Sequence, residues 1–318
     1  MKFTIVTVTW NSAEEVPELL QTSKRHLGDQ AHHIFVDNAS EDGTVELIRS
    51  LSPASQVIDL DENVGTAPAN NIGVKEAQTD VVVLLNPDVL LVDDSLTQLA
   101  GLAGRERALF GARLLNEDHT AQISAFPAVA GWELAVIALV PGAAMPRRLR
   151  ARCEPWRSET RVEAGWLSIA CFAARRDLLM ELGPFDERLP LYGEDTDLCL
   201  RAWQSGIPSL FVPEVARVVH YGNRSGAQAF SDIGISRKME AHRWVARARL
   251  GHLRAAYDMA MQVLLYGTRW LAKAALRRDN EVEKHWLRAA AHLLRHRKPP
   301  APQPIAHTRI RSNDPLVR

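Results

Sequence analysis

The chain of 318 residues has little cysteine and no long uncharged apolar run. Its three cysteines (153, 171 and 199) lie far apart, which excludes a disulfide framework and a cysteine-only zinc site and indicates a reducing compartment. No apolar run reaches the roughly 18 residues that a membrane-spanning helix needs. No basic leader precedes an apolar block at the N-terminus, so we expect no signal peptide.

The chain also has no net charge, but only because negatively and positively charged regions balance over its full length. Residues 1–236 have a balance of −12, whereas residues 237–298 have one of +10. The basic region is either a solvated helical face, a dimer interface, or a surface for peripheral contact with anionic lipid or a pyrophosphate-linked acceptor. A nucleic-acid partner is not expected, because no aromatic-interleaved basic motif accompanies the charge.

Strand and helix patterns alternate through the first half of the chain. The β-branched or continuously apolar runs predict strands at 3–9, 33–36, 56–60 and 80–85. Helices are predicted from a capping box at Ser12 and Glu15 to about 26, over 44–51, and after a loop at 63–73 to about 77. This alternation predicts an α/β fold with an open, mostly parallel sheet.

The second half is less uniform. Residues 105–165 are proline-rich and read as an insertion or mobile, variable region on the acceptor side. Strands and helices are then predicted at 166–174, 177–182, 194–205, 209–212 and 216–220. We therefore expect a sheet domain over 1–236, a basic amphipathic extension of two or three helices over 237–298, and a disordered tail over 299–318.

Polar loops follow the predicted strands, where open α/β sheets bind their ligands. They are Asn11-Ser12, Asp37-Asn38, Asn63–Asn71 and Asn86-Pro87-Asp88. Neither G-x-G-x-x-G nor a Walker lysine loop follows the first strand, so the phosphate chemistry must lie elsewhere.

Two of these aspartates each allow two interpretations. Asp88 follows a stiffening proline and a buried strand, where a carboxylate suits Mg²⁺ or Mn²⁺, but it equally suits a turn cap. Asp37 could accept a hydrogen bond from a base imide, or form a turn with Asn38.

Glu194, Asp195 and Asp197 open a predicted helix, whose dipole stabilises carboxylates at that end. Asp197 is predicted to be the cap, which leaves Asp195 free to act as a general base; all three could instead be structural. His220 ends the last strand and could complete a metal site, or be an ordinary structural histidine.

The order of these motifs carries more information than any one of them. It runs through VTVTWNS (6–12), VDNASEDGT (36–44), ENVG (62–65) with NNxG (70–73), LNPDV (85–89), GPFDE (183–187), YGEDTDLCLR (192–201) and His220. In this order, over about 230 residues, the chain resembles the family-2 glycosyltransferases, which are inverting enzymes with the nucleotide-sugar-binding GT-A fold.

The resemblance implies roles for individual residues. It implies Thr9 and Asp37 as the base-binding pair and Asp195 as the catalytic base. Asp88 would stand at the last position of the metal motif, with His220 as a further ligand of Mg²⁺ or Mn²⁺. The remaining positions that would bind the nucleotide-sugar are Asn11, Asn63, Asn71 and Asn86, with Glu194, Asp197 and Arg201 as secondary candidates.

The Asn-Pro-Asp form resembles the rhamnosyltransferases of cell-wall and O-antigen assembly. It implies a dTDP-L-rhamnose donor, with a UDP-sugar as the alternative, and a glycan, lipid-linked or soluble natural-product acceptor. The expected location is the cytoplasm, including the inner face of the plasma membrane. A catalytically idle relative remains an alternative, whereas a nucleotidyltransferase is disfavoured because its glycine-rich pyrophosphate loop is missing.

Overall fold

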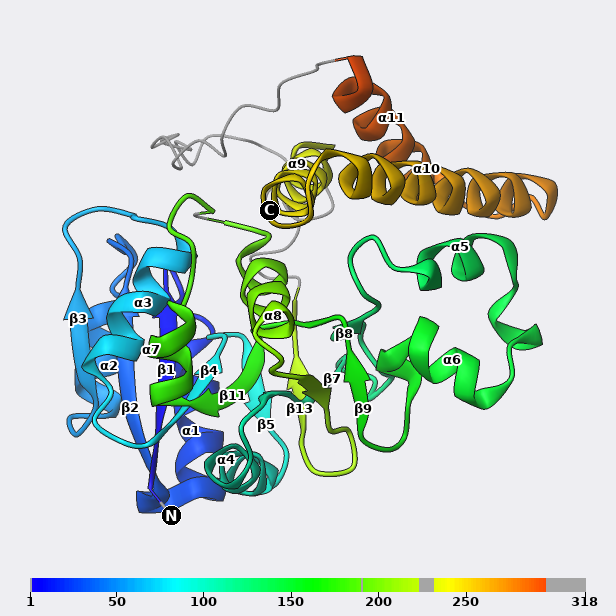
Figure 1. Cartoon of the computed structure of the whole chain (residues 1–318). Coiled ribbons are helices and arrows are strands. Elements are labelled where there is room, and N and C mark those ends of the chain that lie inside the picture. The colour runs from blue at the N-terminus through cyan, green and yellow to red at the C-terminus, as the bar shows by residue number, and fades with distance from the viewer. Residues whose placement is uncertain (1, 190, 223–231, 296–318) are drawn as a thin grey trace.

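In the computed structural model, which describes residues 2–189, 191–222 and 232–295, the α/β core is built on one large sheet (Figure 1). Its strands, in spatial order, are β3 (Gln56–Asp59), β2 (Ala31–Asp37), β1 (Phe3–Thr9), β4 (Val81–Leu85), β11 (Cys171–Arg175), β6 (Leu109–Gly111), β12 (Ser209–Phe211) and β9 (Val162–Ala164). The first four run parallel, and β12 runs parallel to β6. Strand β11 is antiparallel to both of its neighbours.

Two smaller sheets extend the core. One has the order β5 (Val89–Leu91), β13 (Arg217–His220) and β7 (Arg113–Leu115). The other pairs β10 (Trp166–Leu167) with β8 (Ala125–Phe126). Because β13 lies between β5 and β7, it is placed beside two segments that precede it in the chain by a hundred residues or more.

Helices cover both faces of the large sheet, as its alternating buried side chains require. One face, which includes Ile5 and Val83, packs against α1 (Val16–Leu27), α2 (Thr44–Leu51) and α4 (Ser95–Arg105). The opposite face, which includes Val6 and Val82, packs against α3 (Thr66–Glu76), α7 (Arg176–Leu182) and α8 (Glu194–Gln204). Gly73 lets α3 approach β1, because a Cβ at that position would lie 2.2 Å from Val6 Cγ1.

The remaining helices form a layer beside the sheet (Figure 1). They are α5 (Trp132–Leu139), α6 (Arg147–Cys153), α9 (Asp232–Leu250), α10 (His252–Ala275) and α11 (Glu281–Arg295). Elsewhere the chain forms short 3₁₀ turns, at Gly28–Gln30 between α1 and β2, and at Gly142–Ala144 and Pro155–Arg157 on either side of α6. Helix α10 lies along α5, and α9 attaches to α8 through a cluster that includes Leu200, Ala241 and Val245. No helix within the described ranges is both long and apolar enough to cross a bilayer.

The predicted α/β fold with a mostly parallel sheet is confirmed, and so are the strands of the first half and the helix over 44–51. The basic region does form helices, although α9 begins at Asp232 and so crosses the predicted boundary at 236. The three cysteines are free and buried, as expected. The predicted disordered tail over 299–318 lies outside the described residues.

Four local predictions are wrong. Helix α1 begins at Val16 after Glu15, which makes no side-chain cap hydrogen bond, so there is no capping box. Helix α3 begins at Thr66, inside the predicted loop. Pro68 is tolerated there because it stands in the first turn, where a backbone N–H has no hydrogen-bond partner within the helix. Asn71 therefore lies on a helix and not in a loop. The region 105–165 contributes β6 and β9 to the large sheet. The strand predicted at 166–174 is two strands, β10 and β11.

Candidate functional site

The parallel strands end at one edge of the sheet, and their polar loops meet there. Thr9 and Asp37 are register partners at the ends of β1 and β2. Both are fully buried, and Thr9 Oγ1 donates a hydrogen bond of 2.7 Å to Asp37 Oδ1. The Ser40 hydroxyl and backbone N–H also donate to the Asp37 carboxylate, at 2.6 and 2.7 Å. The predicted base-binding pair is therefore brought together, with the carboxylate held by three donors.

Asn11 joins the loops that follow β1 and β2. Its backbone adopts a left-handed conformation with φ of 50°, its N–H donates to Ser40 Oγ, and its Oδ1 accepts from the Glu41 N–H. Asn63 accepts a hydrogen bond from the Gly65 N–H, which turns the chain into α3. Both side chains thus shape the loops beside Asp37, and their contact with a nucleotide stays a prediction.

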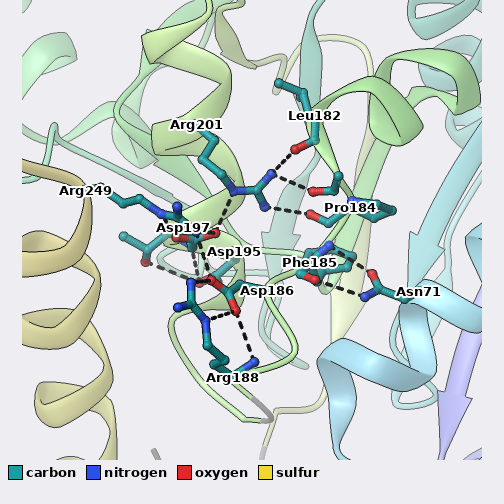
Figure 2. A network of polar contacts seen from close by, with 12 residues as sticks. Asn71, Leu182, Pro184, Phe185, Asp186, Arg188, Asp195, Asp197, Arg201 and Arg249 are labelled. Atoms are coloured by element: carbon teal, nitrogen blue, oxygen red, sulfur yellow. Dashed lines mark hydrogen bonds and ion pairs between the residues drawn. The ribbon is translucent and has the colours of Figure 1, made fainter. Parts of the chain in front are cut away.

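Asn71 bonds to a different segment. Its Nδ2 donates to the Phe185 carbonyl and to Glu187 Oε1, each at 3.0 Å, and its Oδ1 accepts from the Phe185 N–H. These contacts tie α3 to the loop over 183–187 (Figure 2). Its predicted role on the phosphate path is not tested by them.

Asp88 and His220 are brought together by strand pairing. His220 is the register partner of Val89, and the Tyr221 N–H donates to the Asp88 carbonyl at 3.0 Å. His220 Nε2 then lies 3.3 Å from Asp88 Oδ1 and 3.4 Å from Asn86 Nδ2. Burial would raise the pKa of Asp88, but hydrogen bonding and charge from His220, with backbone N–H groups, lower it below its ordinary value.

This pair could hold a divalent cation. A buried carboxylate oxygen and an imidazole nitrogen face each other, and Mg²⁺ or Mn²⁺ in such sites takes one or two protein ligands, with phosphate oxygens and water completing the shell. Among the described residues no group of three or more histidine, cysteine or acidic side chains could do so. The donor set therefore fits an ion shared with a bound diphosphate.

Sequence analysis missed Gln122, which contacts the other side of His220. Its Oε1 lies 2.8 Å from His220 Nδ1, and its Nε2 donates to the His220 carbonyl at 2.9 Å. It precedes β8 in an irregular stretch with no motif, so no signal in the sequence marks it.

The acidic cluster begins α8, as predicted. Both hydrogen bonds that Asp195 receives from described residues come from Thr196 and end on Oδ1, which leaves Oδ2 to take a proton. Burial raises the pKa of Asp195 to about 6, and burial together with the neighbouring charge of Asp195 raises the pKa of Glu194 to about 8. Both carboxyls of this neighbouring pair therefore keep a proton to higher pH than ordinary carboxyls do.

Helix α9 supplies positive charge beside this cluster. Burial alone would lower the pKa of His242, but the charge and the 2.9 Å contact of Asp258, with the charge of Asp195, raise it above its ordinary value. Asp258 is fixed on α10 by the Gln262 side chain, at 2.7 Å. The C-terminal helices thus form part of the surroundings of Asp195.

Asp197 is not the cap of α8; that position is Gly193, with no side-chain cap. The fully buried Asp197 carboxylate instead accepts from Arg201 Nε at 2.7 Å and from Arg249 Nε at 2.6 Å (Figure 2). The Arg201 guanidinium also donates to the carbonyls of Leu182, Gly183 and Pro184. Asp197 and Arg201 therefore hold α8, α9 and the 183–187 loop together.

The candidate residues thus fall into two groups at the candidate site. One contains the strand-end pair Thr9–Asp37 and the pair Asp88–His220; the other contains Asp195 with the charges of α9. No hydrogen bond or ion pair among the described residues links Asp195 to Asp88.

Comparisons with known proteins agree with this architecture. Residues 4–160 match the model of glycosyl transferase family 2. The chain is 26% identical over 258 residues to an N-acetylglucosaminyl-diphospho-decaprenol L-rhamnosyltransferase of Mycobacterium tuberculosis, covering 74% of this chain and 81% of that one. It is 24% identical over 193 residues to the rhamnosyltransferase WbbL of Escherichia coli, covering 57% and 70%.

Solved structures share the fold. The mannosyltransferase PcManGT from Pyrobaculum calidifontis, in complex with GDP-Man and Mn²⁺, superposes with a TM-score of 0.61 at 18% identity, over 93% of this chain and 88% of that one. GalNAc-T7, solved with UDP, GalNAc and Mn²⁺, gives 0.56 at 19% identity, over 76% and 47%. The family match, the curated relatives and the fold lead to one conclusion: the chain is a glycosyltransferase that is similar to family 2 over residues 4–160 and to bacterial rhamnosyltransferases.

Proposed function

We propose that this glycosyltransferase moves L-rhamnose from dTDP-L-rhamnose, with inversion, to a hydroxyl of a lipid-linked glycan. The observation that carries the proposal is the meeting of Asp88 and His220 beside the strand ends that hold Thr9 and Asp37. The name of the mycobacterial relative states transfer of L-rhamnose to a lipid-linked acceptor, and the name of the Escherichia coli relative states rhamnosyl transfer.

Thr9 and Asp37 would recognise the pyrimidine base of the donor. A buried carboxylate that already accepts from Thr9 and Ser40 is fixed in direction. Such an acceptor suits the imide N–H that thymine and uracil share, so this pair fits dTDP- and UDP-sugars.

Asp88 and His220 would hold Mg²⁺ or Mn²⁺. When bound, the ion would neutralise the charge that develops on the departing diphosphate, a contribution of several kcal/mol. Asp88 supplies a hard oxygen ligand and His220 a nitrogen ligand, and the Gly222 N–H keeps the second Asp88 oxygen in place at 3.0 Å.

Asp195 would act as the general base. Its Oδ2 would take the proton of the acceptor hydroxyl as that oxygen attacks the anomeric carbon from the side opposite the diphosphate. The configuration at that carbon then inverts. Burial keeps the carboxylate basic, and a base whose pKa lies near the working pH is effective in such a step.

The acceptor side would lie against a membrane surface. Helix α10 exposes an apolar stripe that includes Leu253, Tyr257 and Leu271, and Leu139 of the neighbouring α5 is exposed as well. Exposed arginines flank the stripe (Arg254, Arg269, Arg277 and Arg278). An apolar stripe with a basic margin suits the headgroup region of an anionic leaflet, where each cationic side chain contributes about 1 kcal/mol.

The donor experiment measures release of nucleoside diphosphate from dTDP-L-rhamnose, UDP-sugars and GDP-sugars, each with Mn²⁺, with Mg²⁺ and with chelator. We expect metal-dependent release from dTDP-L-rhamnose in the presence of a polyprenyl-diphosphate-linked acceptor. Faster turnover of a UDP-sugar with a soluble hydroxyl compound would favour the alternative donor and acceptor. Tight binding of a donor without turnover would indicate an idle relative.

The membrane experiment compares the protein with a Leu253→Glu, Leu271→Glu variant in flotation with vesicles that contain anionic lipid. We expect the variant to float less, whereas Leu51→Glu, a matched change of an exposed leucine on α2, should float as the unaltered protein does. If the variant floats equally but its mass in solution falls from dimer to monomer, the stripe is a subunit interface.

A further inference from the structure

The hairpin over residues 116–122 contacts His220 on the side away from Asp88. Strand β13 lies between β5 and β7, so the end of β13 has the Asp88 loop on one side and the chain that follows β7 on the other. Gln122 is anchored there by its own N–H, which donates to the Leu114 carbonyl at 2.8 Å. The imidazole of His220 is therefore held between Asp88 and Gln122.

The orientation of the Gln122 amide follows from an unambiguous acceptor. Its Nε2 donates to the backbone carbonyl of His220 at 2.9 Å, and a carbonyl can only accept. The same Nε2 donates to Asn116 Oδ1 at 2.9 Å, while Asn116 Nδ2 donates to Thr120 Oγ1 at 2.8 Å. Gln122 Oε1 is thereby directed at His220 Nδ1, 2.8 Å away.

This contact fixes which ring nitrogen keeps its proton. Because Gln122 Oε1 only accepts, Nδ1 must carry hydrogen, and Nε2 is left as the nitrogen that can bind an ion. Nε2 is also the atom that faces Asp88 Oδ1, at 3.3 Å. Histidines that bind metals through one nitrogen are commonly oriented by an acceptor at the other.

Resting on the metal role proposed above for Asp88 and His220, we propose that Gln122 is the positioning residue of that site. It holds the Nδ1–H of His220 so that the Nε2 lone pair points at Asp88 and at an ion bound there. Asn116 in turn keeps the Gln122 amide from rotating. Without Gln122, the neutral His220 ring would carry its hydrogen on Nε2 and not on Nδ1. The hydrogen bond from Nε2 to Asp88 would then occupy the place of the ion.

The first test is the protonation of the His220 ring in the metal-free protein. Long-range ¹H–¹⁵N spectra at mildly alkaline pH, assigned by loss of the signal in His220→Gln, are expected to report hydrogen on Nδ1. In Gln122→Leu the hydrogen is expected on Nε2, and in Gln122→Glu, whose carboxylate still accepts, on Nδ1. An Nδ1 without hydrogen in the unaltered protein, or an Nδ1 that keeps its hydrogen in Gln122→Leu, would overturn the proposal.

The second test is Mn²⁺ affinity, followed by the paramagnetic resonance signal of free Mn²⁺ with dTDP present. Loss of an outer partner of a metal ligand weakens binding by about 10–100-fold, which we expect for Gln122→Leu. Gln122→Glu should restore binding, and Gln78→Leu, at an exposed loop position, should leave it unchanged.

Asp88→Asn separates this inference from the proposed function. If Asp88→Asn abolishes Mn²⁺ binding while Gln122→Leu binds normally and remains folded in thermal unfolding, the positioning role of Gln122 is wrong and the metal site stands. If neither change affects binding, the metal site itself is wrong and the role of Gln122 falls with it.

Discussion

Replacing Asp195 by Asn is expected to remove nearly all sugar transfer while leaving the protein folded. The amide has the size of the carboxylate but cannot take the acceptor proton. General-base assistance contributes about 10²–10⁴-fold, which corresponds to roughly 3–5 kcal/mol in the activation free energy. We expect turnover to fall by that factor, with the affinity for dTDP unchanged, because the proposed base-binding contacts are those of Thr9 and Asp37.

The structure indicates that this loss would not come from unfolding. Burial raises the pKa of Asp195 in the folded state from 3.8 to about 6. Folding therefore favours the protonated form; that stabilisation is complete below the ordinary pKa and is lost as pH rises through about 6. At neutral pH the ionised side chain is in an unfavourable setting that a neutral amide avoids. The Asn variant should thus unfold at a urea concentration no lower than the unaltered protein.

The assay follows transfer from a radiolabelled donor under single-turnover conditions, with donor affinity measured separately by calorimetry. The control is Glu194→Gln, one residue away, where burial raises the pKa to about 8 and the side chain is already neutral at pH 7. It should retain most of the turnover. Ordinary turnover in Asp195→Asn together with loss in Glu194→Gln would refute the assignment of the base.

Three further outcomes are expected. The rate of transfer should rise with pH as Asp195 ionises and level off above about pH 6, measured as kcat/KM across buffers; an unchanged rate well below pH 6 would exclude this base. Asp197→Asn leaves Arg201 and Arg249 without their buried carboxylate and should destabilise the fold by about 3–5 kcal/mol in urea unfolding, whereas a change within 1 kcal/mol would mean the network is unimportant. Asp88→Asn should lose Mn²⁺ binding in calorimetry and lower the melting temperature somewhat, because folding favours the ionised carboxylate; unaltered affinity would remove Asp88 from the metal site.

Local patterns were enough to predict the strands and helices that flank the strand-end loops. The runs 3–9 and 80–85 are apolar, β-branched and bounded by polar turns, so burial on a sheet is their only favourable outcome. Asp37 and Asp88 are predicted for a related reason, because strand ends in a parallel sheet meet at one edge. The role of Thr9 is implied only by the family resemblance, and His220 ends β13, which belongs to the smaller sheet and pairs with β5 in antiparallel fashion.

What sequence reasoning missed depends on contacts between distant segments. The sequence predicts Asp197 to be a helix cap, because only its position at the start of a helix is visible locally. Its partner Arg249 lies 52 residues away on another helix, and no local pattern links the two. Gln122 is one polar side chain in an irregular stretch, and only the pairing of β13 with β7 brings it to His220. The strand β6 has three residues, too few for a periodic signal, although it lies inside the sheet.

The most direct measurement of the central claim is the anomalous signal of Mn²⁺ in crystals grown with dTDP. The account predicts one strong peak within coordination distance of the Asp88 carboxylate and His220 Nε2, with diphosphate oxygens completing the shell and the thymine against Asp37. A peak at any other pair of side chains, with Asp88 and His220 still bonded to each other, would contradict it.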